Sequence, residues 1–579
     1  MAKNITSGRK IAKKLTRISK KAGEATLGHV EENIIDRISH IKHVRLLMLE
    51  WALLVIAIIF LSITQAYWYT DSYAVETYQN GGTYTEATVG EIKTLNPLFA
   101  SSSSEKTIAK LLFLGLSEND YSGHSGYGLA KSIKTPDNGK TWLVKLREGL
   151  KWSDGEPLTN EDVIFTANLI KNPLLNSNYS SNLSGVRVET QEDGAISFNL
   201  AAKNVYFATA LDFPILPKHI LDGVAPELIL EHNFSSKPVG SGAFVYNHTQ
   251  SVGNLGEKVV YLQANDKYYK NRPKIDSFIV HSFLNTSDVI DALNAGTVTA
   301  SGELNGRDVE KVNSSSLSKR QSSLNYGVFA FINTETVSNK SFRKALKQGI
   351  DLSHVREVLS GEQPLDYPIL DSQLKIENYP EKVKLDTNTA KKTIKKVLDG
   401  DSKLKESGLN IATVRSGYLP EVSERLAEEI KSLGVNANVT VYEPGQDFLL
   451  NTLAQRNYDI LVYEIGLGPD PDVFAYYHST EANANGHNLS NYKNTIVSDL
   501  VLSARSTMGV NLRTKKYESF LKYFNEDVPA IGLYQSNLTY FANKNVRAFS
   551  QENRFVTATD RLLDVEQWGI EKTTKNRTP

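Results

Sequence analysis

Residues 139–170 read "GKTWLVKLREGLKWSDGEPLTNEDVIFTANLI", and this stretch decides the fold. Trp142, Val144 and Leu146 fall on one face of an alternating run, which is typical of a half-buried strand. The letters "SDG" then mark a tight turn. Thr159 is a good helix N-cap, and the two acidic residues in the turn after it favour the positive end of a helix. The stretch therefore predicts a strand, a turn and a capped helix, and it contains no visible catalytic group.

Short β-like runs alternate with helical patterns on both sides of this stretch, as in an α/β protein. The chain has 579 residues, which is too long for one compact core, so we expect two or three domains. Its composition, 40% hydrophobic and 22% charged, is that of a globular protein. The absence of cysteine excludes disulfides, thiol catalysis, iron–sulfur sites and cysteine-bound zinc. It also excludes the lipid-modified cysteine of bacterial lipoproteins.

The distribution of charge argues against nucleic acid as a partner. The net charge is zero, but residues 1–70 hold 11 basic and 5 acidic residues, whereas the remaining 509 residues hold 54 and 60. The main body of the chain is therefore mildly acidic, and an acidic surface repels a phosphate backbone.

The one long apolar segment, residues 46–69, reads "LLMLEWALLVIAIIFLSITQAYWY". Its 24 residues exceed the roughly 20 that a helix needs to span a bilayer. Basic residues flank its N-terminal end and aromatic residues its other end, as at the two membrane interfaces. A cleaved signal peptide and a buried core helix are the alternatives, but the long apolar run and the extended basic region favour an uncleaved anchor. The positive-inside rule then places residues 1–45 in the cytoplasm and the main body outside.

Residues 1–45 divide in two. Up to Lys21 they are basic and polar, as expected of a segment that contacts anionic lipid or of a solvated tail. From Val30 to Val44 apolar residues recur at helical spacing, which predicts an amphipathic helix that lies on the bilayer or meets a partner helix. Residues 70–83 contain "QNGG" and are predicted to form a linker.

The extended stretch "GLAKSIKTPDNGKTWLVKLREGLKWSDGEPLTNEDVIFT" closely resembles the signature of extracellular solute-binding proteins of the peptide/nickel type, which serve ATP-driven importers. Eight further landmarks follow the order of that family over residues 84–570. They are "TLNPLFASSSSEKTIAKLLFLGL" (94–116), "ILPKHI" (215–220), "KPVGSGAFVY" (237–246), "NDKYYKNRPKIDSFIV" (265–280), "VIDALNAGTV" (289–298), "FRKALKQGIDLSHVREVLSG" (342–361), "YDILVYEIGLGPDPDVF" (458–474) and "VPAIGLY" (528–534). Each is weak alone, but eight in order are specific.

The resemblance implies an α/β fold of the type II periplasmic-binding-protein class, with two lobes that close on a ligand by hinge motion. By similarity, lobe I would comprise residues 84–283 and 528–571, with an inserted subdomain at about 105–230. Lobe II would comprise residues 284–527, and residues 572–579 would form a tail. The chain would be a monomeric binding protein, not an enzyme.

The resemblance also suggests ligand contacts. In dipeptide- and oligopeptide-binding relatives the loop after the first strand lines the pocket, and here that loop holds Thr94, Leu95 and Asn96. Asn96 precedes a proline, so a simple turn is the alternative. In dipeptide-binding relatives a basic residue before a lobe II helix holds the ligand carboxylate. Arg415 is the candidate here, and an ordinary surface arginine is the alternative.

A second landmark departs from the family pattern. Relatives carry an aspartate before the Asp-Pro of this motif, and it pairs with the α-ammonium of a peptide. The matching position is Leu467, or Gly468 on a shifted alignment, and neither carries charge. Nearby Glu464, Asp470 or Asp472 are candidates to replace the missing carboxylate, although Asp470 matches a residue that usually caps a helix. Further candidates for ligand contact are Ile465, Gly466, Tyr418 and Phe244, of which the aromatic residues are equally compatible with a role in the core.

These patterns predict a membrane-anchored, extracytoplasmic binding protein that delivers a peptide or peptide-like solute to an ABC permease. Residues 46–69 would contact the lipid bilayer. No cofactor is expected, because the 11 histidines form no tight pair at helical spacing. A membrane-tethered sensor on the same fold is the main alternative, suggested by the long cytoplasmic segment. A secreted hydrolase is another, although no G-x-S-x-G, H-E-x-x-H or phosphate-loop motif occurs.

Overall fold

A computed structural model describes residues 45–78, 80–253, 256–549, 553–570 and 572–576. The chain divides into two compact units, one of residues 1–77 and 573–579 and one of residues 78–572. Residues 1–44, which include almost all of the predicted cytoplasmic segment, lie outside the described residues. We describe the two units separately.

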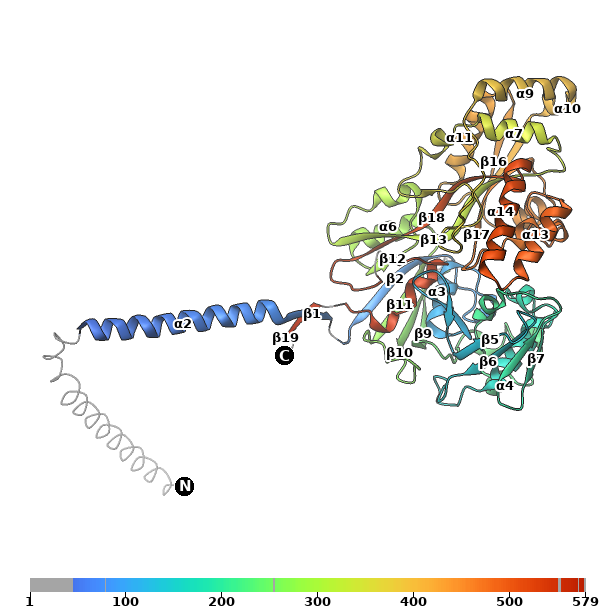
Figure 1. The fold of residues 1–579 in the computed structure, drawn as a ribbon. Coiled ribbons are helices and arrows are strands. Elements are labelled where there is room, and N and C mark those ends of the chain that lie inside the picture. Colours follow the sequence, from blue (N-terminus) through green and yellow to red (C-terminus); the bar gives the residue numbers. More distant parts are fainter. Residues whose placement is uncertain (1–44, 79, 254–255, 550–552, 571, 577–579) are drawn as a thin grey trace, which may run out of the picture. The chain divides into compact units, whose positions relative to one another are not determined.

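The smaller unit contains α2 (Arg45–Tyr73), a single helix of 29 residues (Figure 1). At 1.5 Å per residue it is about 44 Å long, more than the hydrocarbon core of a bilayer. Its segment Leu47–Trp68 has a mean hydropathy of 2.4 and is, within the described residues, the one helix long and apolar enough to cross a membrane. Helices of this kind serve both as membrane anchors and as signal sequences. The helix continues into the predicted linker, where β1 (Ala74–Tyr78) pairs with β19 (Lys572–Asn576).

The larger unit is built on an 11-stranded sheet in the order β16-β15-β17-β13-β18-β12-β2-β11-β10-β9, with β14 paired to β18. Parallel and antiparallel pairs are mixed. In chain order the strands are β2 (Thr83–Val89), β9 (Phe244–Val252), β10 (Glu257–Ala264), β11 (Ser277–Phe283), β12 (Ala300–Ser301), β13 (Leu317–Ile332), β14 (Gln363–Pro364), β15 (Leu409–Val414), β16 (Ala437–Tyr442), β17 (Ile460–Gly466) and β18 (Ala530–Asn543).

Two large hydrophobic cores lie along this sheet. Core 1 gathers buried residues between Tyr84 and Ala300 with others from residues 538–568. Core 2 gathers buried residues between Val328 and Tyr534. Strands β13 and β18 contribute to both cores, because Leu324 and Leu538 belong to core 1 whereas residues 328–332 and 530–534 belong to core 2. The two longest strands of the sheet therefore connect the cores.

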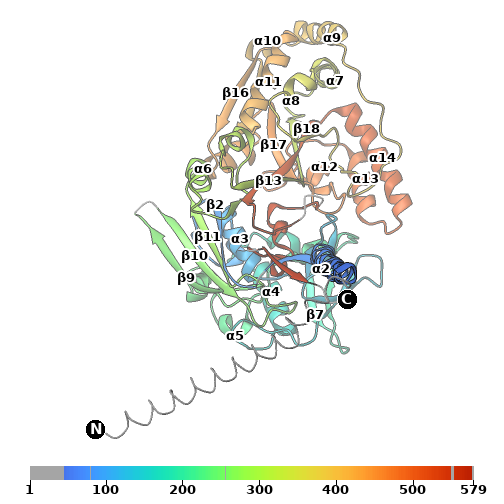
Figure 2. The same cartoon turned by 90° about the vertical axis from the view of Figure 1, so that its left-hand side faces the viewer.

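Amphipathic helices cover core 2, as Figures 1 and 2 show around β13 and β15–β18. In α11, for example, Val422, Leu426 and Ile430 recur every four residues and are fully buried. The helices are α7 (Lys340–Gly349), α8 (Leu352–Arg356), α9 (Thr387–Gly400), α10 (Ser402–Ser407), α11 (Leu419–Ser432), α12 (Phe474–Tyr477), α13 (Thr495–Arg505) and α14 (Val510–Asp527).

Core 1 includes the stretch that decided the fold. Strand β6 (Thr141–Leu146) buries Trp142 and Val144, and α4 (Asn160–Lys171) begins after Thr159, whose Oγ1 accepts a hydrogen bond from the Glu161 N–H at 3.3 Å. The predicted strand and capped helix are confirmed. β6 belongs to a sheet in the order β5-β6-β8-β7, with β5 (Ala130–Lys134), β7 (Arg187–Thr190) and β8 (Ile196–Asn199). The remaining elements are α3 (Ser103–Leu112), α5 (Lys218–Leu221), α6 (Thr286–Ala295) and the short pair β3 (Ser117–Asn119) and β4 (Ser125–Tyr127).

Candidate functional site

A cavity of about 540 Å³, here cavity A, opens where β13 and β18 pass between the two cores. One wall comes from segments near core 1, at residues 302–305 and 536–539 together with Ala558. The other wall comes from core 2, at residues 414–419, 444–449 and 463–464. Residues from far-apart parts of the chain thus meet around one space.

An irregularity in the pairing of β13 with β18 shapes this cavity. Ser323 lies opposite Asn537 and Gly327 lies opposite Gln535, so three residues of β13 face the single residue Ser536. Such a bulge bends a strand and redirects its side chains. Here it places Tyr326 in the wall of cavity A, and no local pattern in the sequence announces it.

Asn325, inside the same bulge, ties β13 to the chain that leaves β17. Its side chain is 2% exposed and its Nδ2 donates to the Gly468 carbonyl at 2.8 Å. The Leu467 N–H donates to the Asn325 carbonyl at 2.7 Å. These bonds fix the end of β17 next to the cavity.

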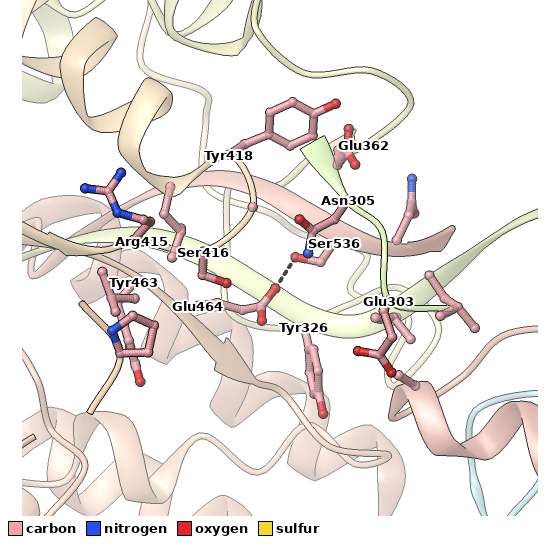
Figure 3. Close-up of a pocket in the computed structure, with 18 of the residues that line it drawn as sticks. Glu303, Asn305, Tyr326, Glu362, Arg415, Ser416, Tyr418, Tyr463, Glu464 and Ser536 are labelled. Atoms are coloured by element: carbon pink, nitrogen blue, oxygen red, sulfur yellow. Dashed lines mark hydrogen bonds between the residues drawn. The ribbon is translucent and has the colours of Figure 1, made fainter. Parts of the chain in front are cut away.

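Carboxylates dominate the polar lining of cavity A. Glu464 accepts a hydrogen bond from the Ser536 hydroxyl (Figure 3), and Glu303 accepts one from the Ser103 hydroxyl. Desolvation raises the pKa of both glutamates and that of Glu362, which lines the cavity too. Each of these carboxylates would be more stable with a cation nearby.

Arg415 is the cation in the lining of cavity A, but it already has a partner. Its Nε donates to the Glu443 carboxylate at 2.6 Å, and this pairing raises its pKa. Its side chain is 62% exposed and, in Figure 3, the guanidinium is turned away from Glu464. The cavity therefore presents an excess of negative charge.

A second cavity of about 680 Å³, here cavity B, adjoins the first. Tyr326 and Ala558 line both spaces. Its other walls come from α3, from β3 and from two short 3₁₀ helices, η5 (Phe207–Asp212) and η11 (Ala558–Leu562). Cavities A and B thus share part of one wall.

Three of the predicted contact residues, Arg415, Tyr418 and Glu464, come together in the lining of cavity A. Thr94, Leu95 and Asn96 line neither cavity. All three are buried, and Asn96 caps the 3₁₀ helix η3 (Pro97–Phe99) by accepting a hydrogen bond from the Leu98 N–H at 3.1 Å.

The remaining predicted residues also lie outside the cavity linings. Phe244 is fully buried in core 1, with its ring 5.4 Å from that of Phe278. Ile465 and Leu467 are buried in core 2, and Gly466 lies against the Tyr326 ring. Asp470 lies beyond them, where burial and then the nearby Asp472 raise its pKa to about 6. That these residues contact a ligand stays a prediction.

Sequence reasoning missed most of the cavity. The missed lining residues include Glu303, Tyr326, Glu362, Tyr534 and Ser536. They come from four separate segments, so no motif unites them, and their common location follows from the sheet topology alone. Within the residues that the structure describes, no group of three metal-ligating side chains lies close enough to hold a metal ion.

Known proteins resemble this chain along most of its length. It is 26% identical over 518 residues to the oligopeptide-binding protein AppA of Bacillus subtilis, an alignment that covers 85% of this chain and 92% of AppA. Over 173 residues it is 31% identical to a putative ABC transporter peptide-binding protein of Brucella ovis, covering 29% of this chain and 32% of that protein.

Solved structures show the same fold. The substrate-binding protein CtaP of Listeria monocytogenes superposes with a TM-score of 0.73 at 24% identity, covering 85% of this chain and all of CtaP. AppA of B. subtilis, solved in complex with a nonapeptide, superposes with a TM-score of 0.68 at 24% identity, covering 85% of this chain and 100% of AppA. NikZ of Campylobacter jejuni, solved with Ni(L-His), has a TM-score of 0.70 at 22% identity, covering 84% and 99%.

A family model settles the assignment. The model of bacterial extracellular solute-binding proteins, family 5, matches residues 126–486, which is more than half of the chain. Its members bind solutes for ABC transporters and do not catalyse reactions, in agreement with the prediction from sequence. The chain belongs to family 5 of the bacterial extracellular solute-binding proteins.

Proposed function

We propose that this protein is a membrane-anchored, extracytoplasmic binding protein that captures peptides in cavities A and B and delivers them to an ABC permease. One observation carries the proposal: cavity A lies between two hydrophobic cores that share β13 and β18. A ligand in such a cavity touches both cores at once, so its binding energy favours the state in which they are close together.

The two cores correspond in this proposal to two lobes. Lobe I holds residues 84–283 and 528–571, with the inserted subdomain at about 105–230, and lobe II holds residues 284–527, except that residues 530–534 pack into core 2 whereas Ala300 and Leu324 pack into core 1. Contacts between α13–α14 and the 203–206 segment support a closed arrangement of the lobes. The Val205 N–H donates to the Arg505 carbonyl at 2.9 Å, and the hydroxyls of Tyr206 and Tyr517 are 3.2 Å apart.

A peptide is the proposed ligand because a relative named for oligopeptide binding matches this chain over most of its length. Glu464, Arg415 and Tyr418 are the proposed contacts in cavity A. Glu464 takes over the role of the missing family carboxylate, since Leu467 is uncharged and buried. The ligand would reach the permease after lobe closure, with α2 holding the protein at the membrane.

Native mass spectrometry and small-angle scattering test this function on the full chain in detergent. We expect peptides to co-purify or to bind from a mixed library, and the radius of gyration to fall on binding. Glu464→Gln should weaken binding of peptides with a free N-terminus about tenfold, which is the value of one charge-assisted hydrogen bond. The matched control Glu424→Gln changes an exposed carboxylate outside cavities A and B and should leave binding unchanged. A scattering profile that stays the same with every bound peptide would contradict lobe closure.

Anchoring is tested separately. We expect the full-length chain to remain in the membrane fraction after a high-salt wash, with its N-terminus intact by Edman sequencing or mass spectrometry. A mature protein that starts after residue 69 would show that α2 is a cleaved signal sequence.

A further inference from the structure

Cavity B is lined by a carboxylate, Asp212, that Lys110 stabilises only at longer range, without an ion pair between them. Asp212 is the last residue of η5 and lines the cavity. Among the residues that the structure describes, no side chain forms a hydrogen bond or an ion pair with this carboxylate. It stays in contact with solvent in the cavity, but the protein around it desolvates it and raises its pKa to about 6. An ionised carboxylate in such a place gains free energy from any cation that reaches it.

The two other carboxylates in the lining of cavity B already have partners. Glu118 lies 2.9 Å from the Lys110 ammonium and 3.5 Å from that of Lys270. Asp560 accepts hydrogen bonds from Asn119 Nδ2 at 3.0 Å and from two backbone N–H groups in its own capping turn. Asp212 is the carboxylate left over.

A second observation in the same cavity indicates space for a ligand group. Ser117 lines cavity B and is 3% exposed, yet its Oγ has no hydrogen-bond partner among the described residues. A buried hydroxyl without a partner costs free energy, and a ligand that donates or accepts a hydrogen bond there would recover it.

The backbone holds Asp212 firmly against this wall. The Leu116 N–H donates to the Leu211 carbonyl at 3.0 Å, and the Ile215 N–H donates to the Leu114 carbonyl at 3.0 Å. Gly115 permits this close approach, because a Cβ at that position would lie 2.5 Å from the Asp212 carbonyl oxygen. The backbone of Asp212 therefore does not have to be ordered when a cation binds, which lowers the entropic cost of binding.

These observations lead to one inference, which rests on the proposed function. The geometry points to cavity B as the subsite for a cationic group of the ligand, an ammonium or a guanidinium, which pairs with the Asp212 carboxylate. Asp212 is in this view a specificity-determining residue. The cation is a basic side chain if Glu464 binds the peptide N-terminus, and it is that N-terminus if Glu464 does not. Lys106, which also lines cavity B, is exposed to solvent and forms no ion pair with Asp212 in the part of the chain that the structure describes.

The test uses the full chain in detergent and matched hexapeptides. One series moves a single lysine through an alanine background, and a second series carries norleucine at the same positions. Each peptide is made with a free and with an acetylated N-terminus. Competition binding by native mass spectrometry should show at least one lysine peptide, or one free N-terminus, preferred about tenfold over its uncharged partner.

Substitutions at Asp212 then test whether its carboxylate binds the cation. Asp212→Asn and Asp212→Ser should reduce the preference to about unity, while affinity for the uncharged peptides changes by less than about twofold. Asp212→Glu should retain the preference. Asp222→Asn is the matched control, because this exposed carboxylate lies ten residues further on and outside the lining of cavities A and B. Retained affinity for the norleucine peptides shows that each variant is folded.

The outcomes distinguish a failure of this inference from a failure of the proposed function. Loss of the lysine preference assigns the cation to a side chain, and loss of the sensitivity to acetylation assigns it to the N-terminus; both support the inference. The inference is overturned if peptides bind and the preference for the cation persists in both neutral Asp212 variants. It is also overturned if the wild type binds peptides without any such preference. In both cases the proposed function is retained. If the wild type binds none of the peptides, both are overturned.

Discussion

Glu86 and Asp212 are both carboxylates, but the fold provides for them in opposite ways. Glu86 in β2 is 0% exposed and accepts a hydrogen bond from Arg561 Nε at 2.9 Å, with a second from the same guanidinium. The Tyr84 hydroxyl also donates to it, at 3.2 Å. Asp212 receives no such partner from any described side chain and faces cavity B.

The difference distinguishes a carboxylate that stabilises the fold from one that is available to a ligand. A buried charge is tolerated when it is paired and satisfied by hydrogen bonds, so the Glu86–Arg561 pair belongs to the framework. It joins β2 to η11 although the two residues are 475 positions apart. A carboxylate that lies unpaired on a cavity wall costs free energy in the unliganded protein, and this cost is recovered when a cation binds. By the same reasoning, Glu464 of cavity A is a carboxylate available to a ligand, like Asp212 and unlike Glu86.

The largest effect is expected from breaking the framework pair. Arg561→Met leaves Glu86 buried without its partner and should lower the free energy of unfolding by about 3–5 kcal/mol. Urea unfolding of the full chain in detergent, followed by circular dichroism, measures the loss. The double variant Glu86→Gln/Arg561→Met removes the stranded charge and should recover part of it. A loss below about 1 kcal/mol in the single variant would show that Glu86 does not depend on this pairing.

A smaller effect is expected at Glu105, a carboxylate satisfied by backbone donors. Burial alone would raise its pKa, but N–H groups of Ser101, Lys93, Ser102 and Thr94 outweigh that effect and lower the pKa. Glu105→Gln replaces one acceptor oxygen by an NH₂ group that faces these donors, and it should cost about 2 kcal/mol of unfolding free energy at pH 7.

The pH dependence checks this interpretation of Glu105. A folded-state pKa below the unfolded value means that the stabilisation is present above about pH 4.3 and is lost as the pH falls through the folded pKa. The difference between wild type and Glu105→Gln should therefore shrink at low pH. Glu156→Gln, at an exposed glutamate, is the control and should show no such trend. A difference that is constant from pH 7 to pH 3 would contradict the role of the ionised carboxylate.

The smallest effect, and one of opposite sign, is expected at Asp212. Its folded-state pKa of about 6 lies above the unfolded value of about 3.9, so its contribution to stability is present below pH 3.9 and is lost as the pH rises through 6. Burial causes most of the shift, Lys110 opposes it and Asp560 adds to it. At pH 7 without ligand, Asp212→Asn should therefore be as stable as the wild type or up to about 1 kcal/mol more stable, because solvent in the cavity screens the charge.

Thermal unfolding at pH 4 and pH 7 measures this effect. The stabilisation by Asp212→Asn should be present at pH 7 and absent at pH 4. Destabilisation at pH 7 would mean that the carboxylate has a structural partner and would place Asp212 in the same class as Glu86.

Local sequence patterns were sufficient to predict these helices and strands and to identify the family. The strand from Trp142 to Leu146 and the helix capped by Thr159 follow from side-chain alternation and capping chemistry, which act within a few residues. The apolar run that became α2 is equally local. The spacing of landmarks over residues 84–570 identified the family because each landmark is itself a local element.

The candidate site was predicted in part. Arg415, Tyr418 and Glu464 lie near the ends of β15 and β17, where the resemblance placed contacts, and they do line cavity A. Thr94, Leu95 and Asn96 follow the first strand as expected, yet they are buried, with Asn96 capping η3. Whether a residue next to a strand end faces a cavity depends on what packs over it, and the sequence does not state that.

The sequence by itself determined the helices, the strands, the apolar helix before them and membership of a solute-binding family, because periodicity and capping depend on near neighbours. Only the tertiary structure brought Glu303, Tyr326 and Glu464 around one space, placed Asp212 in the wall of a second cavity, and paired Glu86 with Arg561. The reason is electrostatic and geometric. A carboxylate is structural or available to a ligand according to whether the fold supplies a cation beside it, and that cation comes from a distant part of the chain.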